Sequence, residues 1–156
     1  MDAGRISYRP AEPADAEFLF KLKNDEGVRQ SSIQSRDGVR WEPHQAWLRD
    51  ALENDRLALW IIELNGEPVG TWRMEKAGPD LVEVAIHLMP EARGKGIGAH
   101  TIRQWGNCRT ANWMAKILDS NEASIGLFKF SGFAEWYTTP KACETPYHEY
   151  ILWRKA

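Results

Sequence analysis

Near the middle of the chain stands the segment Pro90-Glu91-Ala92-Arg93-Gly94-Lys95-Gly96-Ile97-Gly98-Ala99-His100. It follows an apolar, strand-like run at 81–88 and opens a helix-like run at 97–109. Glycine at every second position lets the backbone turn tightly and direct several N–H groups to one point. The first N–H groups of a helix are unpaired and lie at its positive dipole end. The segment therefore predicts an anion site, most simply for a phosphate.

Composition and charge limit the classes of function. The chain has 156 residues, of which 43 % are hydrophobic and 27 % charged, and this predicts one globular domain over residues 1–156. A formal net charge of −2 gives no general attraction to nucleic acid, so nucleic-acid binding is not expected. Cys108 and Cys143 lack the spacing of a metal site, and no metal is expected.

The N-terminal residues are mixed and polar, without the apolar core of a signal peptide. No apolar run reaches transmembrane length. We therefore expect a cytoplasmic protein without membrane contact. The sequence leaves a homodimer open.

The remaining pattern mixes strand and helix signals. Asn65-Gly66 between two apolar runs predicts a β-hairpin, with the turn slightly lengthened by Glu67 and Pro68. A long polar segment, 24–40, is expected to be irregular, and such loops are often functional. Strands are predicted at 5–9, 57–64, 69–74, 81–88, 113–118, 133–137 and 148–153, and helices at 13–24, 41–54, 97–109 and 121–131. This order predicts an α+β sandwich, a mixed central sheet of about seven strands flanked by about four helices.

Three interpretations of the glycine segment compete. A dinucleotide site fits the spacing G-x-G-x-x-A of Gly94, Gly96 and Ala99, but five residues separate strand from glycines and too little chain follows for more parallel units. A P-loop fails because Ile97 follows Gly96 in place of Lys-Ser or Lys-Thr. A glycine-rich helix start without a ligand is the third interpretation.

Two motifs together favour another family. Arg93-x-x-Gly96-x-Gly98, between an apolar strand and a helix, resembles the acetyl-coenzyme A signature of the GNAT superfamily of N-acetyltransferases. The later segment Asn121 to Phe133 is similar to that superfamily's asparagine, small residue, aromatic and terminal Gly-Phe. The order of elements over nearly the whole chain is also similar, which implies a mostly antiparallel sheet. A weaker likeness is to bacterial nucleotide-aminosugar acetyltransferases.

The resemblance implies which residues bind acetyl-CoA. The pyrophosphate would lie on the backbone N–H groups of Arg93, Gly94, Lys95, Gly96, Ile97, Gly98 and Ala99. The strand before the motif would splay from its neighbour, so that Leu88 and Met89 supply main-chain contacts to the pantetheine arm. One N–H there would face the thioester carbonyl. Asn121 would touch the same arm, although it is equally suited to cap a helix.

The implied reaction is direct attack of a primary amine on the thioester. An amine with a pKa of about 10 is mostly protonated at neutral pH, so a base must remove a proton. Glu83 is the first candidate because a carboxylate within an apolar strand is costly unless paired or used. His87, on the same strand face, is the second.

The chain departs from the family pattern at Phe128. Many members carry tyrosine there, whose hydroxyl protonates the leaving thiolate, and phenylalanine cannot donate a proton. Tyr137, Tyr147 and Tyr150 are candidates to replace it, although packing is the simpler role for each. A thiol with a pKa of about 8.5 is also a tolerable leaving group without an acid. Segment 24–40, Trp72-Arg73 and segment 140–146 are expected to wall the acceptor side, where Trp41, Trp47, Trp72 and Trp136 offer stacking surfaces.

The sequence therefore predicts an acetyl-CoA-dependent N-acetyltransferase acting on a small-molecule amine such as an aminosugar, a polyamine or an amino-acid-like compound. One alternative acceptor is a peptide or aminoacyl-tRNA, although a pI near 6.1 argues against tRNA. A second alternative, which Phe128 makes conceivable, is a non-catalytic acyl-CoA-binding regulatory module.

Overall fold

A seven-stranded mixed sheet forms the centre of the computed structural model, which describes residues 4–33, 37–139 and 146–154. The strand order is β1-β2-β3-β4-β5-β7-β6, and every neighbouring pair is antiparallel except β4 and β5. The strands are β1 (Ile6–Pro10), β2 (Leu57–Leu64), β3 (Glu67–Gly78), β4 (Leu81–Leu88), β5 (Asn112–Leu118), β6 (Ala134–Thr138) and β7 (Tyr147–Leu152). The predicted α+β sheet is confirmed.

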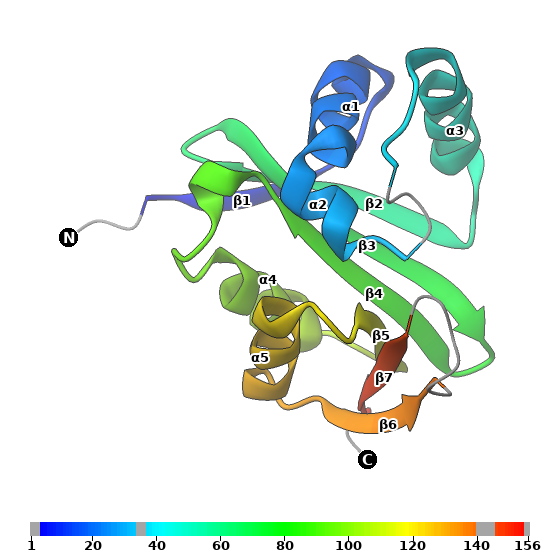
Figure 1. Cartoon of the computed structure of the whole chain (residues 1–156), viewed down its shortest axis with the longest axis vertical. Coiled ribbons are helices and arrows are strands. Elements are labelled where there is room, and N and C mark those ends of the chain that lie inside the picture. The colour runs from blue at the N-terminus through cyan, green and yellow to red at the C-terminus, as the bar shows by residue number, and fades with distance from the viewer. Residues whose placement is uncertain (1–3, 34–36, 140–145, 155–156) are drawn as a thin grey trace.

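The helices divide between the two faces of the sheet. In Figure 1, α1, α2 and α3 lie on one side of β2 to β4, and α4 and α5 lie on the other. In the described residues the α-helices are α1 (Ala16–Asn24), α2 (Glu26–Ser31), α3 (Trp41–Glu53), α4 (Ile97–Gly106) and α5 (Glu122–Phe130), with short 3-10 turns η1 (Pro13–Asp15) and η2 (Pro90–Ala92). The hydrophobic clusters follow the same division, because Ile61 packs with Leu19 and Leu48 while Ile62 packs with Ile97 and Phe128.

Two local predictions are corrected. Segment 24–40 contains a helix, α2, because the Asp25 side chain caps it by accepting a hydrogen bond from the Val28 N–H at 3.1 Å. The hairpin turn consists of Asn65 and Gly66 alone, since both have positive φ, 54° and 83°, and β3 begins at Glu67. A turn with two left-handed residues matches the twist of the strands that it joins, so no lengthening is needed.

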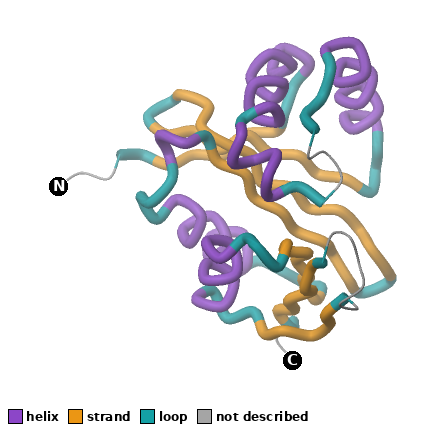
Figure 2. Tube along the Cα trace, viewed as in Figure 1, coloured by secondary structure: helices purple, strands orange, loops and turns teal. Residues whose placement is uncertain are grey.

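The sheet opens between β4 and β5. These two parallel strands pair only at Leu81↔Asn112, Val82↔Trp113 and Glu83↔Met114. Beyond Glu83 the two strands separate, as the tube in Figure 2 shows. The last part of β4 therefore has a neighbour on one side only, and this opening positions the site.

Candidate functional site

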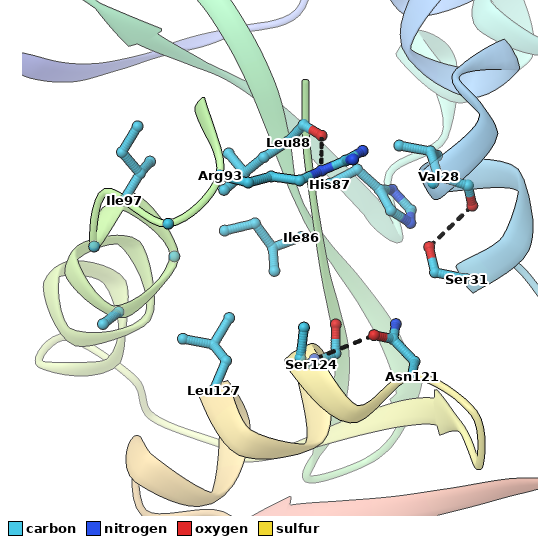
Figure 3. A pocket seen from close by; sticks show the side chains of 16 residues that line it. Val28, Ser31, Ile86, His87, Leu88, Arg93, Ile97, Asn121, Ser124 and Leu127 are labelled. Atoms are coloured by element: carbon cyan, nitrogen blue, oxygen red, sulfur yellow. Dashed lines mark hydrogen bonds between the residues drawn. The ribbon is translucent and has the colours of Figure 1, made fainter. Parts of the chain in front are cut away.

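A cleft of about 500 Å³ lies beside the unpaired end of β4. It is lined by the end of β4, the glycine segment, the start of α5 and one face of α2, and Figure 3 shows side chains from all four around it. Its walls include Ile86, His87, Leu88, Gly94, Gly96, Asn121, Leu127 and Val28. The structure thus brings together the strand, the glycines and the asparagine that the sequence predicted, and adds α2.

Main-chain groups of β4 face this cleft. The Met89 N–H donates to the Val69 carbonyl on β3 at 2.8 Å. Because bonding alternates along an antiparallel pair, Ile86 and Leu88 direct their N–H groups away from β3, into the opening. Leu88 is therefore placed as predicted, whereas the N–H of Met89 is already used and its side chain is buried.

The glycine segment presents bare backbone to the same cleft. Gly94 and Gly96 have positive φ, 72° and 78°, which strains any residue with a Cβ. No atom lies within 4 Å of where such a Cβ would be, so the space in front of these two residues is open. Gly96 is also the N-cap of α4 and provides no capping side chain, which leaves the first N–H groups of the helix available to an anion.

Gly98 has a different role from its two neighbours. A Cβ at Gly98 would lie 2.8 Å from Leu127 Cδ2 on α5. Real Cβ atoms do not approach so closely, so any larger residue at this position would require the Leu127 side chain to move. Gly98 therefore shapes the cleft through helix packing, in addition to any contact of its backbone.

The Arg93 side chain turns from the glycines toward α2. Its Nε donates to the Leu88 carbonyl at 3.2 Å (Figure 3), and its Nη2 donates to Asp25 Oδ2 at 2.5 Å. A Cβ on Gly27 would lie 2.7 Å from Nη1, so the guanidinium packs directly on α2. Burial alone would raise the pKa of Asp25, but the bonds from Arg93 and from backbone N–H groups hold it below its usual range. The Asp25–Arg93 bridge therefore links α2 to the glycine segment.

The other predicted cofactor residues divide into those at the cleft and those away from it. Ile97, Ala99 and Asn121 line it, and Asn121 Oδ1 caps α5 by accepting from the Ser124 N–H at 3.2 Å. The Asn121 amide N–H₂ is left to meet a ligand. Lys95 is exposed, and Phe128 is buried against Phe133 in the core.

His87 lies at the α2 end of the cleft. Figure 3 shows its ring directed toward Val28 and Ser31. Burial, and to a smaller extent the positive charges of Arg73, Lys23 and Arg93, lower the pKa of His87 to about 4. The imidazole is therefore neutral at pH 7 and able to accept a hydrogen bond from an amine.

Glu83 lies on the same strand face as His87 but outside the cleft lining. Its Oε1 is 3.6 Å from Lys116 Nζ on β5. Glu83 and His87 are four positions apart along the strand, which is roughly 13 Å. The two candidate bases are thus at opposite ends of one face, and only His87 lines the cleft.

The expected acceptor walls are placed in part. Trp72 is fully buried and packs against Trp113, so it offers no stacking surface. Arg73, the next residue, points to the opposite face and shares it with His87. Trp41 and Trp47 pack around His44 beneath Lys23. Segment 140–145 lies outside the described residues.

The sequence predicts segment 24–40 as an acceptor wall, but it does not single out the residues of this segment that line the cleft. Gly27, Val28 and Ser31 line the cleft, and Asp25 holds Arg93. A capping signal, Asp25 three residues before Val28, was present in the sequence but is weak in a polar segment. Lys23 lies in an ordinary helical pattern and carried no signal at all.

In the described part of the chain, no three His, Cys, Asp or Glu side chains gather in a way that would hold a metal ion. Within the same residues, no helix combines the length and apolarity needed to cross a membrane.

A splayed parallel strand pair, a glycine segment and a helix N-terminus around one cleft define an acyl-coenzyme A-binding transferase fold. The family model described as "Acetyltransferase (GNAT) domain" matches residues 5–134, and the chain belongs to this family.

Relatives agree with this assignment. The chain is 31 % identical, over 94 % of its length and 95 % of the relative's, to the "Putative phosphinothricin acetyltransferase YwnH" of Bacillus subtilis. A crystal structure of spermidine N-acetyltransferase from Vibrio cholerae with CoA and spermine matches with TM-score 0.83, 13 % identity and coverage of 96 % and 95 %. Salmonella typhimurium yncA with acetyl-CoA matches with TM-score 0.78, 19 % identity and coverage of 98 % and 96 %.

The residues present fit the cofactor of the family. Gly94 and Gly96 leave open the space that a Cβ would fill, and Ile86 and Leu88 direct their main-chain N–H groups at the same cleft. The protein is an acetyl-CoA-dependent acetyltransferase.

Proposed function

We propose that this protein acetylates the primary amine of a small molecule by direct attack on acetyl-CoA. One observation supports this most strongly: a single cleft joins the glycine segment to His87 past the open edge of β4. Such a cleft holds the cofactor at one end and leaves the other end for the amine. Proteins of similar fold are named as a spermidine N-acetyltransferase and a "putative phosphinothricin N-acetyltransferase", and both names give a small molecule as the acceptor.

The chain's own backbone would hold the cofactor. Backbone N–H groups from Arg93 to Ala99 would bind the pyrophosphate, and Ile86 and Leu88 would bind the pantetheine arm, with Asn121 opposite them. Acetyl-CoA supplies the acetyl group as a thioester. The Leu88 N–H is suited to donate to the thioester carbonyl oxygen, where negative charge develops.

Proton transfer involves the two candidate bases differently. The amine nitrogen forms a bond to the acetyl carbon, the carbon–sulfur bond breaks, and the amine loses a proton. Neutral His87 lines the cleft, so it is assigned the hydrogen bond that orients the amine. Glu83 lies farther along the strand, so it is assigned the proton after relay through water.

Among the described residues that line the cleft there is no tyrosine, so none supplies the hydroxyl that Phe128 lacks. Tyr150 is buried in the core, and burial raises its pKa, so it is a poor acid for this step. A thiol has a pKa of about 8.5 and leaves as a thiolate near neutral pH. The reaction therefore proceeds without a dedicated general acid.

The test combines acetyl-CoA titration by calorimetry with a thiol-release assay over an amine panel. We expect cofactor binding and release of the thiol with at least one small amine. Glu83→Gln should lower kcat by roughly a hundredfold with unchanged cofactor affinity, whereas the exposed-carboxylate control Glu53→Gln should change neither. Binding without release for any amine would instead identify an acyl-CoA-binding regulatory module.

A further inference from the structure

The helix ends around the cleft differ in the hydrogen bonds that they can form with a ligand. At the glycine end, α4 begins after Gly96 and offers its first N–H groups. Asn121 adds the two N–H bonds of its amide, because its Oδ1 already accepts from the Ser124 N–H. Donors of this kind suit an anion. An amine brings N–H groups of its own and therefore requires acceptors.

Ser31 lines the opposite end of the cleft as the last residue of α2. Its side chain is half-buried, and Figure 3 shows the His87 ring directed toward Val28 and Ser31. The last residues of a helix leave carbonyl oxygens, in place of N–H groups, without a partner in the helix. Hydrogen-bond acceptors therefore lie at this end of the cleft, in contrast to the start of α4.

The Ser31 hydroxyl is arranged to accept a hydrogen bond from a ligand. Its Oγ donates to the Val28 carbonyl at 2.9 Å, as the dashed line between these two residues in Figure 3 shows. A hydroxyl has one proton and two lone pairs. Because the proton is used within α2, the lone pairs remain for a donor in the cleft.

His87 supplies a second acceptor at the same end. Its ring is neutral at pH 7, and a neutral imidazole has one nitrogen that carries a proton and one that accepts. Ser31 and His87 come from different elements, α2 and β4, and both line the cleft. Two acceptors from opposite walls thus face one space.

The other polar side chains of the described cleft lining suit an amine less well. Arg93 is positively charged and already donates to Asp25 and to the Leu88 carbonyl. Ser124 lies in the first turn of α5, where the positive end of the helix dipole disfavours a cation. Ser31 and His87 are therefore the side chains best suited to hold an amine.

We propose that Ser31 binds the acceptor amine, with its hydroxyl oxygen accepting one N–H of the amine while the His87 ring accepts another. This inference rests on the proposed N-acetyltransferase function and adds a second residue that holds the substrate. A neutral primary amine has two N–H groups and one lone pair. With both N–H groups bonded, the lone pair is left to attack the acetyl carbon. A secondary amine has a single N–H and would leave one acceptor without a partner.

The experiment uses the thiol-release assay with the full chain and three primary amines: glucosamine, spermidine and L-leucine. Ser31→Ala should raise the KM for the reacting amine by about tenfold, which is the loss expected for one hydrogen bond, with a smaller change in kcat. The affinity for acetyl-CoA, measured by calorimetry, should stay unchanged. Ser31→Thr keeps a hydroxyl and should retain most of the wild-type KM.

Ser131→Ala is the matched control. Ser131 Oγ donates to the Leu127 carbonyl at 2.8 Å at the end of α5, and Ser131 is not part of the cleft lining. Both alanine variants lose the same kind of local bond at a helix end, so urea denaturation should show similar small losses of stability. Only Ser31→Ala should change the KM for the amine.

Two kinetic results would overturn the proposal. One is a KM for the amine that is the same in Ser31→Ala, Ser131→Ala and the wild type. The other is a rise in KM for Ser31→Thr as large as that for Ser31→Ala, because it would assign the effect to the shape of the side chain and not to its hydroxyl.

Binding separates this proposal from the proposed function. Calorimetric titration of the same three amines into the CoA-bound protein requires no turnover. If no amine releases thiol, the proposed acetyl transfer to small amines fails, and weaker binding of an amine to Ser31→Ala than to the wild type would still support the Ser31 site. If the two proteins bind every amine equally, or the wild type binds none, the assignment of Ser31 fails whatever the turnover.

Discussion

The two ends of the cleft are built from different parts of the chain. At the end proposed for the cofactor, the groups that would meet the ligand are main-chain N–H groups of Gly94, Gly96 and Leu88, whose residues line the cleft. At the end proposed for the acceptor, side chains line the cleft, among them those of His87 on β4 and Ser31 on α2. The cofactor end depends on backbone conformation, and the acceptor end depends on side-chain identity.

This difference predicts how each end tolerates substitution. A cofactor site made of backbone is lost when the backbone changes, and it hardly responds to a change of charge nearby. An acceptor site made of side chains can change specificity through single substitutions without loss of the fold. Substitutions at the two ends should therefore affect cofactor affinity and amine selectivity separately.

The largest effect is expected from Gly96→Val. A β-branched residue at a φ of 78° costs about 1–2 kcal/mol or shifts the backbone, and its side chain would occupy the open space before α4. Acetyl-CoA affinity, measured by calorimetry, should fall by about a hundredfold or more. Gly126→Ala, an exposed helical glycine with no atom within 4 Å of the new Cβ, is the control and should bind normally. If Gly96→Val bound acetyl-CoA as tightly as the wild type, the proposed pyrophosphate site made of backbone N–H groups would be refuted.

The Asp25–Arg93 bridge joins the two ends, so its loss should affect both. Asp25→Asn keeps a cap for α2 but removes the charge that holds Arg93. We expect about a tenfold rise in KM for both acetyl-CoA and the amine, with a smaller change in kcat. Arg93→Met should behave in the same way, and the double variant should be no worse than either single one. Additive losses would show that the two residues act independently.

Acid stability should respond to His87. Its pKa is about 4 in the folded protein against 6.5 in the unfolded chain, so the unfolded chain binds more protons between these values. The free energy of unfolding therefore falls as the pH decreases from 6.5 to 4. His87→Gln should flatten this part of the profile, as measured by urea denaturation at several pH values. A profile identical to that of the wild type would mean that burial does not suppress protonation of His87.

The smallest effect on stability is expected at His148, which is not part of the cleft lining. Its pH dependence has the opposite sign to that of His87. Asp119 and Glu135 accept from its two ring nitrogens at 2.6 and 2.7 Å and raise its pKa above the usual value. The contribution of His148 to the free energy of unfolding is present below pH 6.5 and is lost as the pH rises through the raised pKa. Because both carboxylates are largely exposed, His148→Gln should cost only about 0.5 kcal/mol at pH 6 and almost nothing at pH 9.

The difference between the cofactor end and the acceptor end also explains which features could be predicted from the sequence. The fold and the cofactor end follow from local patterns, such as Asn65-Gly66 for the hairpin and the glycines before Ile97 for the anion site. The role of Gly98 in packing on Leu127 could not be predicted, because it depends on how two distant helices approach each other.

The acceptor end was harder to predict for a related reason. Lys23 reaches Trp47 and the surroundings of His87 only after α1 and α3 dock on the sheet. The bridge from Asp25 to Arg93 spans 68 positions of sequence, and no local pattern around either residue indicates its partner. Long-range contacts of this kind leave no periodic signal.

The opening between β4 and β5 has a consequence for the stability of the whole chain. From Leu81 to Glu83, three residue pairs join β4 to β5 and so connect the two halves of the sheet. After Glu83, the main-chain groups of Ile86 and Leu88 that point away from β3 have no strand to bond with. A pantetheine arm, which carries amide groups of its own, would then act as a partial strand that completes the ladder. Since only the folded chain offers this edge, cofactor at a hundred times its Kd would add about 2.7 kcal/mol to the free energy of unfolding. The melting temperature of the protein would thus report the supply of acetyl-CoA around it.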